Sequence, residues 1–210
     1  MKSKPLKYTS DIAFTPKVKA IQEKYRSRSS YALMEQSEGW QSIITPPLEM
    51  FLRSMDSFYL GTANTEGQPY IQHRGGPKGF LKVLDEKRLA FADFSGNRQY
   101  ISTGNLSENN KAFIFLMDYP NRSRIKIWGT AKVVFDDKEL LESLSDESYN
   151  AKLERVVIFT VEAWDMNCPQ HIQQRFTQED IEKVTKPLLE RIKALENELE
   201  SQNSLRALKK

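Results

Sequence analysis

Cysteine and histidine are the scarcest reactive residues of this 210-residue sequence. It has one cysteine, Cys168, and two histidines, His73 and His171, which lie far apart along the chain. A single thiol excludes a disulfide within the chain, so we expect a reducing compartment, the cytoplasm. Zinc sites need clustered thiolate and imidazole ligands. The sequence therefore predicts that no metal is bound.

Long apolar runs are also missing. The longest ones, 112–117 and 156–161, are far shorter than the roughly 20 residues that cross a bilayer. The N-terminal residues contain no apolar run of the kind found in secretory signals. We therefore expect neither a signal peptide nor a membrane partner.

Positive charge is in excess only near the N-terminus. Residues 1–30 carry eight Lys or Arg against two acidic residues, whereas the rest of the chain carries 23 against 26. A nucleic-acid footprint needs basic residues concentrated on a folded face. The sequence therefore predicts no nucleic-acid partner. Thr15 and Pro16 favour the start of a helix that ends near Arg28, and we expect this arm to pack on the body.

Aromatic and β-branched residues are well represented, with 11 Phe, 8 Tyr and 3 Trp in a sequence that is 39% hydrophobic. Segments with strand periodicity follow one another with short connections, which is typical of an antiparallel barrel. They cover residues 58–63, 69–74, 80–84, 88–93, 112–118, 124–135 and 155–163. Helices are expected from Pro46, from Asn97 to Asn109, and after an Asp cap at the run that begins at Asp136.

The strand expected at 124–135 has two different faces. One face is apolar and predicts core, and it carries Ile125, Ile127, Ala131, Val133 and Phe135. The other face carries Arg124, Lys126, Trp128, Thr130 and Lys132. That second face fits an interface or an anion, or equally a surface indole between snorkelling cations.

The last 33 residues carry an apolar seam at three- and four-residue spacing, made of Ile181, Val184, Leu188, Ile192, Leu195 and Leu199. This is a heptad pattern of only about three repeats. A helix that packs on its own body and an intermolecular coiled coil both fit it.

Two charged connections could bind a ligand. The first, 73–80, reads HRGGPKGF, in which glycines allow close approach of the backbone and Arg74 and Lys78 could neutralise a phosphate. On its own it is equally a tight turn that carries charges. The second, 93–100, reads DFSGNRQY and leads into the helix expected at Asn97, whose N-terminus is a favourable place for phosphate. Adjacent antiparallel strands would bring the two connections together.

The residues from about 45 to 175 resemble the pyridoxamine 5′-phosphate oxidase-like FMN-binding split barrels. The resemblance rests on an ordered series: HRGGPKGF, D-x-x-GN-R, SxxNLxxNxK, the apolar strand AFIFLM, and RIKIWGTAKV. It implies a mainly β fold with flanking helices, in which a six-stranded antiparallel split β-barrel forms a homodimer with FMN at the subunit interface. The expected domains are then an N-terminal helical arm (1–44), an FMN-binding split barrel domain (45–177) and a C-terminal amphipathic helix (178–210).

The resemblance also assigns candidate FMN-binding residues by position. Asn97 and Arg98 match a phosphate-binding pair, and Arg124 falls where the second subunit contributes a polar side chain to the flavin. Asp93 stands where the family has a hydroxylated residue, and Gln99 where the true oxidases have lysine. The full candidate set is Arg74, Gly75, Gly76, Lys78, Gly79, Phe80, Asp93, Gly96, Asn97, Arg98, Ser102, Arg124, Gln170, His171 and Arg175.

The segment CPQHIQQRF, 168–176, replaces the Arg-x-His substrate signature of the vitamin B6 oxidases. It resembles the tail of a different subgroup. Independently of the resemblance, it follows the last expected strand directly and concentrates Trp164, Cys168, Gln170, His171 and Arg175, which could form one wall of a ligand pocket. The expected function is that of a flavoprotein, an oxidoreductase that uses FMN for hydride or electron transfer with an unidentified small molecule. A non-catalytic flavin- or haem-binding protein with the same fold is the alternative.

Overall fold

The computed structural model describes residues 7–146, 149–167 and 169–207. Its helical elements are η1 (Thr9–Ile12), α1 (Pro16–Lys24), α2 (Arg28–Gln36), α3 (Pro46–Ser54), α4 (Ile101–Glu108), α5 (Lys138–Leu144) and α6 (Gln178–Ala207). Its strands are β1 (Ser57–Ala63), β2 (Pro69–Gly75), β3 (Lys82–Val83), β4 (Arg88–Phe94), β5 (Lys111–Asp118), β6 (Ser123–Val134) and β7 (Leu153–Asn167). None of the helices in the described part of the chain combines the length and apolarity needed to cross a bilayer.

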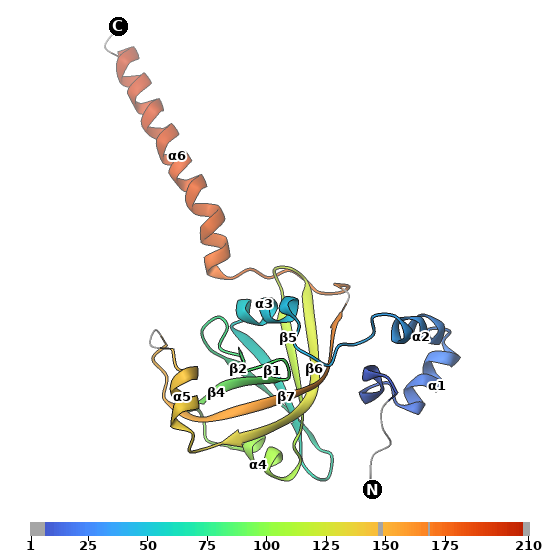
Figure 1. Cartoon of the computed structure of the whole chain (residues 1–210). Coiled ribbons are helices and arrows are strands. Elements are labelled where there is room, and N and C mark those ends of the chain that lie inside the picture. Colours follow the sequence, from blue (N-terminus) through green and yellow to red (C-terminus); the bar gives the residue numbers. More distant parts are fainter. Residues whose placement is uncertain (1–6, 147–148, 168, 208–210) are drawn as a thin grey trace. The chain divides into compact units, whose positions relative to one another are not determined.

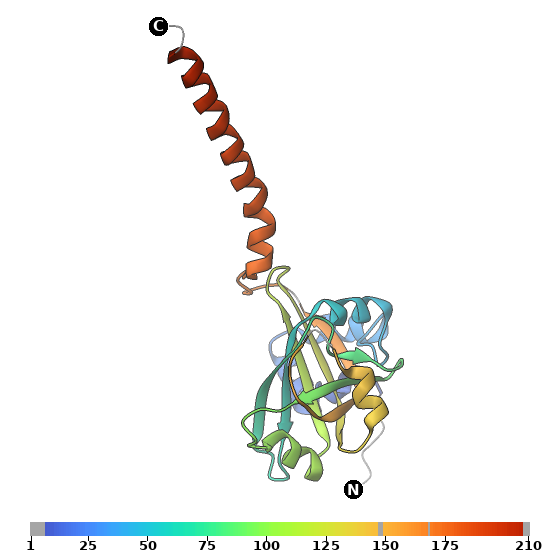
Figure 2. The same ribbon diagram turned by 90° about the vertical axis from the view of Figure 1, so that its left-hand side faces the viewer.

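All of these strands join one antiparallel sheet in the order β2-β1-β5-β6-β7-β4-β3 (Figures 1 and 2). Chain neighbours β1–β2, β3–β4 and β5–β6 pair directly, and β7 pairs on its two sides with β6 and β4. The expectation of a mainly antiparallel β fold with helices is thereby confirmed. The seven segments with strand periodicity correspond to β1–β7, whereas the six strands implied by the family resemblance are one too few, because the two-residue strand β3 adds a ladder to the edge beyond β4.

Alternating burial explains why the central strands form. In β5, the residues Ala112, Ile114 and Leu116 are buried and the residues between them are not. Ile125 and Ile127 of β6 are fully buried beside them. Period-two burial of this kind is the signature of a sheet with one face on the core.

Helix α3 covers one end of this core. Thr45 precedes two prolines that preset the first helical turn, and the buried face of the helix presents Leu48 and Leu52, both fully buried. They belong to the same apolar cluster as Phe58, Phe91 and Phe159. A second, smaller cluster lies under α5, whose cap Asp137 accepts a hydrogen bond from the Leu140 N–H at 3.0 Å, as expected for a helix after this acid.

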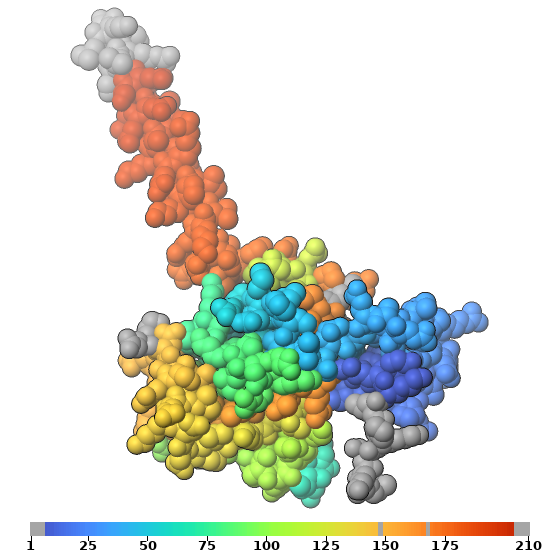
Figure 3. Space-filling model, in the orientation of Figure 1, coloured from blue at the N-terminus to red at the C-terminus, as the bar shows by residue number. Residues whose placement is uncertain are grey.

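The N-terminal arm folds around one buried acid. The side chain of Glu35 is only 1% exposed, accepts a hydrogen bond from Ser10 Oγ at 3.1 Å, and forms ion pairs with Arg28 and Lys19. The helix expected to end near Arg28 ends at Lys24 instead, and Arg26 adopts a left-handed φ of 63° that a right-handed helix cannot include. In the space-filling view the arm (blue) lies directly against the rest of its unit (Figure 3).

Aromatic side chains join the arm to the outer face of β6. Trp40 stacks on Trp128 with ring centroids 4.6 Å apart, and Phe14 packs on Trp40 at 5.0 Å. The Lys126 ammonium lies 5.3 Å from the centroids of both indoles. The polar face of β6 is therefore covered near Trp128 by this chain's own arm.

The chain divides into two compact units. One contains Met1–Asp118 and Ser123–Pro169, and the other contains Tyr119–Arg122 and Gln170–Lys210. The arm and the whole sheet belong to the first unit. Helix α6, with Pro187 inside it, belongs to the second.

Two details of the expected elements are wrong. Phe135, expected on the core face of β6, lies just beyond the end of that strand and is 55% exposed. The helix expected from Asn97 begins at Ile101, so Arg98 precedes it rather than lying in its first turn. Arg98 and Tyr100 have φ values of 59° and 55°, and left-handed residues cannot continue into a right-handed helix.

Candidate functional site

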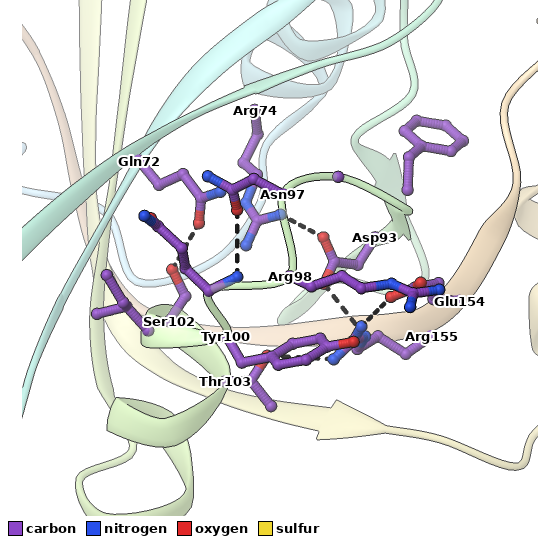
Figure 4. A pocket seen from close by; sticks show the side chains of 14 residues that line it. Gln72, Arg74, Asp93, Asn97, Arg98, Tyr100, Ser102, Thr103, Glu154 and Arg155 are labelled. Carbon is purple, nitrogen blue, oxygen red and sulfur yellow. Dashed lines mark hydrogen bonds and ion pairs between the residues drawn. The ribbon is translucent and has the colours of Figure 1, made fainter.

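A polar pocket of about 260 Å³ lies where β2, β4, β7 and the start of α4 meet (Figure 4). Three arginines line it, each from a different segment: Arg74 from β2, Arg98 from the connection before α4, and Arg155 from β7. Two acids, Asp93 and Glu154, also line it. Three cations and two acids leave a formal charge of +1, which favours an anionic ligand.

Asp93 lies between two of the guanidinium groups. Arg74 donates a hydrogen bond from Nη1 to Asp93 Oδ1, and Arg155 Nε is 3.4 Å from Asp93 Oδ2. Asp93 on β4 and Arg155 on β7 are directly opposite in the antiparallel register, which explains why they meet. All three side chains are nearly buried, so these ion pairs are poorly screened by solvent.

Arg155 has the largest number of partners in the pocket. It donates to Glu154 Oε2 and, from Nη1, to Thr103 Oγ1 at 3.5 Å, and its guanidinium lies 4.8 Å from the Tyr100 ring centroid. Burial alone would lower the pKa of Arg155, but the Glu154 hydrogen bond and the charge of Asp93 raise it. This guanidinium therefore stays charged at any physiological pH.

The pKa of Glu154 is lowered, first by a hydrogen bond from the Ser95 hydroxyl and then by Arg155. Ser95 N–H also donates to the Lys152 carbonyl at 2.8 Å, which ties the connection after β4 to the start of β7. Glu154 is therefore ionised at neutral pH and holds the connection and Arg155 in place.

The connection before α4 has an unusual backbone. Arg98 and Tyr100 both occupy the left-handed region, which costs about 1 kcal/mol for each residue other than glycine. Residues 101–103 at the first turn of α4 line the pocket, where helix N–H groups have no partner within the helix. Ser102 Oγ donates to Gln72 Oε1 at 2.9 Å and so joins α4 to β2. This arrangement directs a helix N-terminus and Arg98 at the same pocket.

Two donors of the pocket lack a hydrogen bond within the described part of the chain, although one of them, Arg155 Nε, faces Asp93 Oδ2 at 3.4 Å. Arg74 Nε and Arg155 Nε are buried and have no hydrogen-bond partner among the described residues. A buried donor without a partner is costly, and natural structures rarely retain one without a reason. The pocket therefore has capacity for additional acceptor oxygens, the groups that a phosphate or carboxylate ligand supplies.

A second, more open hollow of about 580 Å³ adjoins the pocket and shares Arg155 and Tyr100 with it. Phe135, which the sequence pattern predicts in the core, lines this hollow. Its ring centroid lies 5.8 Å from the Arg155 guanidinium. The Arg155 guanidinium is therefore within 6 Å of the ring centroids of both Tyr100 and Phe135.

Six of the candidate residues lie together in the pocket: Arg74, Asp93, Gly96, Asn97, Arg98 and Ser102. The glycine-rich run after Arg74 does not line it. Gly76 is required by close packing, since a Cβ there would lie 2.7 Å from the Phe80 ring, and Gly79 adopts φ +74° beside the Arg53 backbone. Phe80 is buried against Phe58. For this segment the structure supports the turn interpretation.

The remaining candidates lie in other places. Gly75 pairs with Ser57 at the end of β2, Lys78 follows it in the turn, and Arg124 lies on β6 opposite Met117. Gln170, His171 and Arg175 belong to the second unit. There the Arg175 guanidinium lies 4.8 Å from the Tyr119 ring centroid. Cys168 lies outside the described residues.

The sequence interpretation missed several residues of the pocket: Gln72, Tyr100, Thr103, Glu154 and Arg155. The pair Glu154 and Arg155 gave a usable signal, because it directly precedes the apolar run 156–159 of the same strand. A buried charged pair needs partners, and it could have been assigned to a site on that ground.

The known proteins give one sequence match and several structural likenesses. A sequence model of the pyridoxamine 5′-phosphate oxidase family matches residues 44–168. No curated protein matches the chain. HupZ of Group A Streptococcus is 16% identical, with a TM-score of 0.46 over 63% of this chain and 99% of that one.

Two further solved structures give similar values. An FMN-binding protein from Syntrophomonas wolfei is 13% identical, with a TM-score of 0.45 over 72% of this chain and 97% of that one. A protein from Clostridium acetobutylicum, related to general stress protein 26 of the pyridoxinephosphate oxidase family, is 19% identical, with a TM-score of 0.43 over 63% of this chain and 98% of that one. The sequence match covers more than half of the chain and includes every strand that lines the pocket, so this protein belongs to the pyridoxamine 5′-phosphate oxidase family.

Proposed function

We propose that this protein is an FMN-binding flavoprotein, and that the pocket lined by Arg74, Arg98 and Arg155 binds the FMN phosphate. The observation that carries the proposal is the convergence of three guanidinium groups with two buried, unsatisfied Nε donors within the described residues. Guanidinium groups bind phosphate through paired, charge-assisted hydrogen bonds. Family membership supports a flavin nucleotide as the ligand that carries this phosphate.

The residues present fit a phosphate. Arg74 Nε can donate a further hydrogen bond, Arg98 is exposed at the pocket, and the first turn of α4 adds its N–H groups. Arg155 Nε can also donate, in competition with Asp93 Oδ2 at 3.4 Å. Asp93 opposes this fit, because its carboxylate already occupies Nη1 of Arg74 and faces Arg155. When the phosphate binds, Arg74 and Arg155 must therefore form hydrogen bonds or ion pairs with both Asp93 and the phosphate.

FMN supplies hydride or electron transfer when it is bound. The chain's part is to anchor the phosphate and to fix the position of the ring system relative to the sheet. Asp93 and Glu154 hold the arginines in position, and the Ser102–Gln72 hydrogen bond fixes the first turn of α4. We assign no proton transfer to any side chain of the pocket.

FMN is favoured over FAD for two reasons. The three arginines converge on one place, which fits a single terminal phosphate. The sequence also has no dinucleotide-binding glycine motif. Mass spectrometry of the cofactor released from purified protein is the test. FMN in a yellow protein supports the proposal, whereas FAD, or a Soret band after haem addition without flavin, contradicts it.

We propose an oxidoreductase that does not act on pyridoxine 5′-phosphate. The phosphate of that substrate needs cations besides those that hold FMN, and this chain has CPQHIQQRF in place of the Arg-x-His signature. Arg175 in that segment has its guanidinium over the Tyr119 ring. A peroxide-coupled assay with pyridoxine 5′-phosphate should show no steady turnover, and turnover that is lost in Arg175→Ala would contradict this proposal.

We further propose that the sheet is the split barrel of this family and that the protein is a homodimer with the cofactor at the interface. On the outer face of β6 the Arg124 end is the part left for such an interface, because Trp40 of this chain already covers the Trp128 region. Interfaces of obligate dimers commonly bury about 2,000 Å² or more. Light scattering that finds a monomer with stoichiometric FMN would contradict the homodimer.

A further inference from the structure

Helix α6 carries a continuous stripe of exposed apolar side chains. Seven residues are between 40% and 65% exposed: Ile181, Val184, Leu188, Leu189, Ile192, Leu195 and Leu199. A soluble helix normally buries such a stripe, and a single helix of 30 residues gains little stability from intrinsic propensity alone. The stripe therefore requires a partner surface.

The spacing assigns these residues to a heptad register. Positions d are Ile181, Leu188 and Leu195, and positions a are Thr185, Ile192 and Leu199. Leucine at two of the three d positions, with Ile192 at the central a position, fits two parallel strands in a coiled coil. Pro187 then falls at position c, so its ring lies on the outer face and outside the seam, although it removes one backbone hydrogen bond of the helix.

Charge also favours the parallel orientation. In a parallel pair, position g of one helix faces position e of the next heptad in its partner, so Arg191 faces Glu196 of the second copy, twice per dimer. Val184 faces Leu189 in the same way, which explains why the apolar stripe widens there. An antiparallel pair with the same overlap would instead place Arg191 against Arg191 and Glu196 against Glu182.

We propose that α6 is a self-association element, which pairs with α6 of a second copy of this chain as a parallel, two-stranded coiled coil. The apolar seam, the residue choice at a and d, and the complementary Arg191 and Glu196 positions all point to the same occupant. The inference does not depend on the cofactor.

Disulfide trapping in the full-length chain tests this proposal. In a Cys168→Ser background, Ile192→Cys places one thiol at position a, where the two copies of the residue meet in a parallel pair. Air oxidation at low protein concentration should give mostly disulfide-linked dimer. The matched control Lys193→Cys, at outer position b, should oxidise at least about tenfold more slowly because its thiols point away from the seam. Equal rates, or no dimer from Ile192→Cys, would overturn the proposal, since α6 would then pack on its own chain or remain single.

A charge-exchange experiment tests the orientation. Arg191→Glu and Glu196→Arg are each made in the Ile192→Cys background, so that each homodimer has like charges across the seam. Co-expression of the two variants restores both attractive pairs. The equilibrium constant for converting the two homodimers into heterodimer, taken from the three linked species, should exceed its statistical value by about tenfold, or about 1.4 kcal/mol. A purely statistical mixture, as resolved by mass spectrometry, would contradict the parallel pairing.

Discussion

Replacing Asp93 by asparagine should have opposite effects on cofactor binding and on folding. The asparagine side chain keeps an oxygen that can accept the Arg74 hydrogen bond but lacks the negative charge that faces Arg155 at 3.4 Å. The charged side chains that remain in the pocket would then carry a formal charge of +2 instead of +1. FMN should therefore bind more tightly to the variant, whereas the folded apoprotein should be less stable than the wild type.

The magnitude follows from burial. Asp93 and Arg155 are each less than a tenth exposed, so an effective dielectric constant of about 20 applies. A carboxylate and one phosphate charge on opposite sides of a shared guanidinium, about 6 Å apart, then repel by about 3 kcal/mol. Allowing for half of this to be lost to relaxation and solvent, FMN should bind at least about tenfold more tightly to the Asp93→Asn variant.

The cost to folding comes from the same residues. Arg74 and Arg155 would lose the acid between them, and a hydrogen bond to a charged group contributes about 2 kcal/mol. The apoprotein should therefore unfold at a lower temperature than the wild type, while added FMN should raise the unfolding temperature by more than it does in the wild type.

Fluorescence titration with FMN and thermal unfolding with and without FMN measure the two effects. Asp85→Asn is the matched control: Asp85 lies in the exposed turn between β3 and β4, pairs with Arg88, and should leave FMN affinity within about twofold. Weaker or unchanged FMN binding in Asp93→Asn would refute the electrostatic argument and show that Asp93 makes a favourable contact with the cofactor.

Three further outcomes are expected. Arg98→Ala should weaken FMN binding by about 1.5 kcal/mol, seen by titration, without lowering apoprotein stability, because Arg98 is exposed; lost stability would show a structural role instead. Burial raises the pKa of Glu35, but hydrogen bonds from Arg28 and Ser10 outweigh burial, so the pKa is lowered from its ordinary value of 4.5. The ionised acid therefore stabilises the arm above pH 4.5, and this contribution is lost as the pH falls through the lowered pKa. Glu35→Gln should cost about 2 kcal/mol of unfolding free energy at neutral pH and should flatten the acid side of the curve of stability against pH; an unchanged acid side would contradict this. Gly129→Ala should abolish soluble expression, because its Cβ would lie 2.0 Å from the Thr160 carbonyl oxygen, whereas the control Gly104→Ala meets nothing within 4 Å and should leave the protein folded.

Strand identity and strand faces could be read from the sequence, because burial alternates with the side chains. Ile125 and Ile127 were predicted as core and are fully buried. The prediction was wrong at Phe135, because an alternating pattern shows which residues share a face but not where the ladder ends. In the structure β6 ends at Val134, and Phe135 turns toward Arg155 instead of the core.

The pocket could be predicted in part. Arg74 and the connection 93–98 do meet as expected, but the expected reason is wrong, because β2 and β4 are not adjacent in the sheet. Asp93 and Arg98 flank one connection, and a strand end before a helix is a recognisable place for a phosphate. Arg155 is 62 positions after Asp93, and only the β4–β7 register brings them together. That register depends on β7 pairing with strands on both of its sides, which no local pattern encodes.

The glycine-rich run illustrates a different difficulty. Glycine permits close approach equally well to a ligand and to another part of the chain. Gly76 and Gly79 make way for Phe80 and for the Arg53 backbone. The glycines therefore predict that other atoms approach this segment closely, but they do not show whether those atoms belong to a ligand or to the chain itself.

The aromatic junction between the arm and the sheet determines what intrinsic fluorescence can report. All three tryptophans of the chain lie at this junction: Trp40 stacks on Trp128, and Trp164 donates from Nε1 to the Ile43 carbonyl at 2.7 Å. Emission and near-ultraviolet circular dichroism will therefore follow detachment of the arm, with the stacked indoles giving a coupled dichroic band that disappears when they separate. Changes confined to the arginine pocket will be almost silent in these signals, and their natural probe is the fluorescence of the flavin itself.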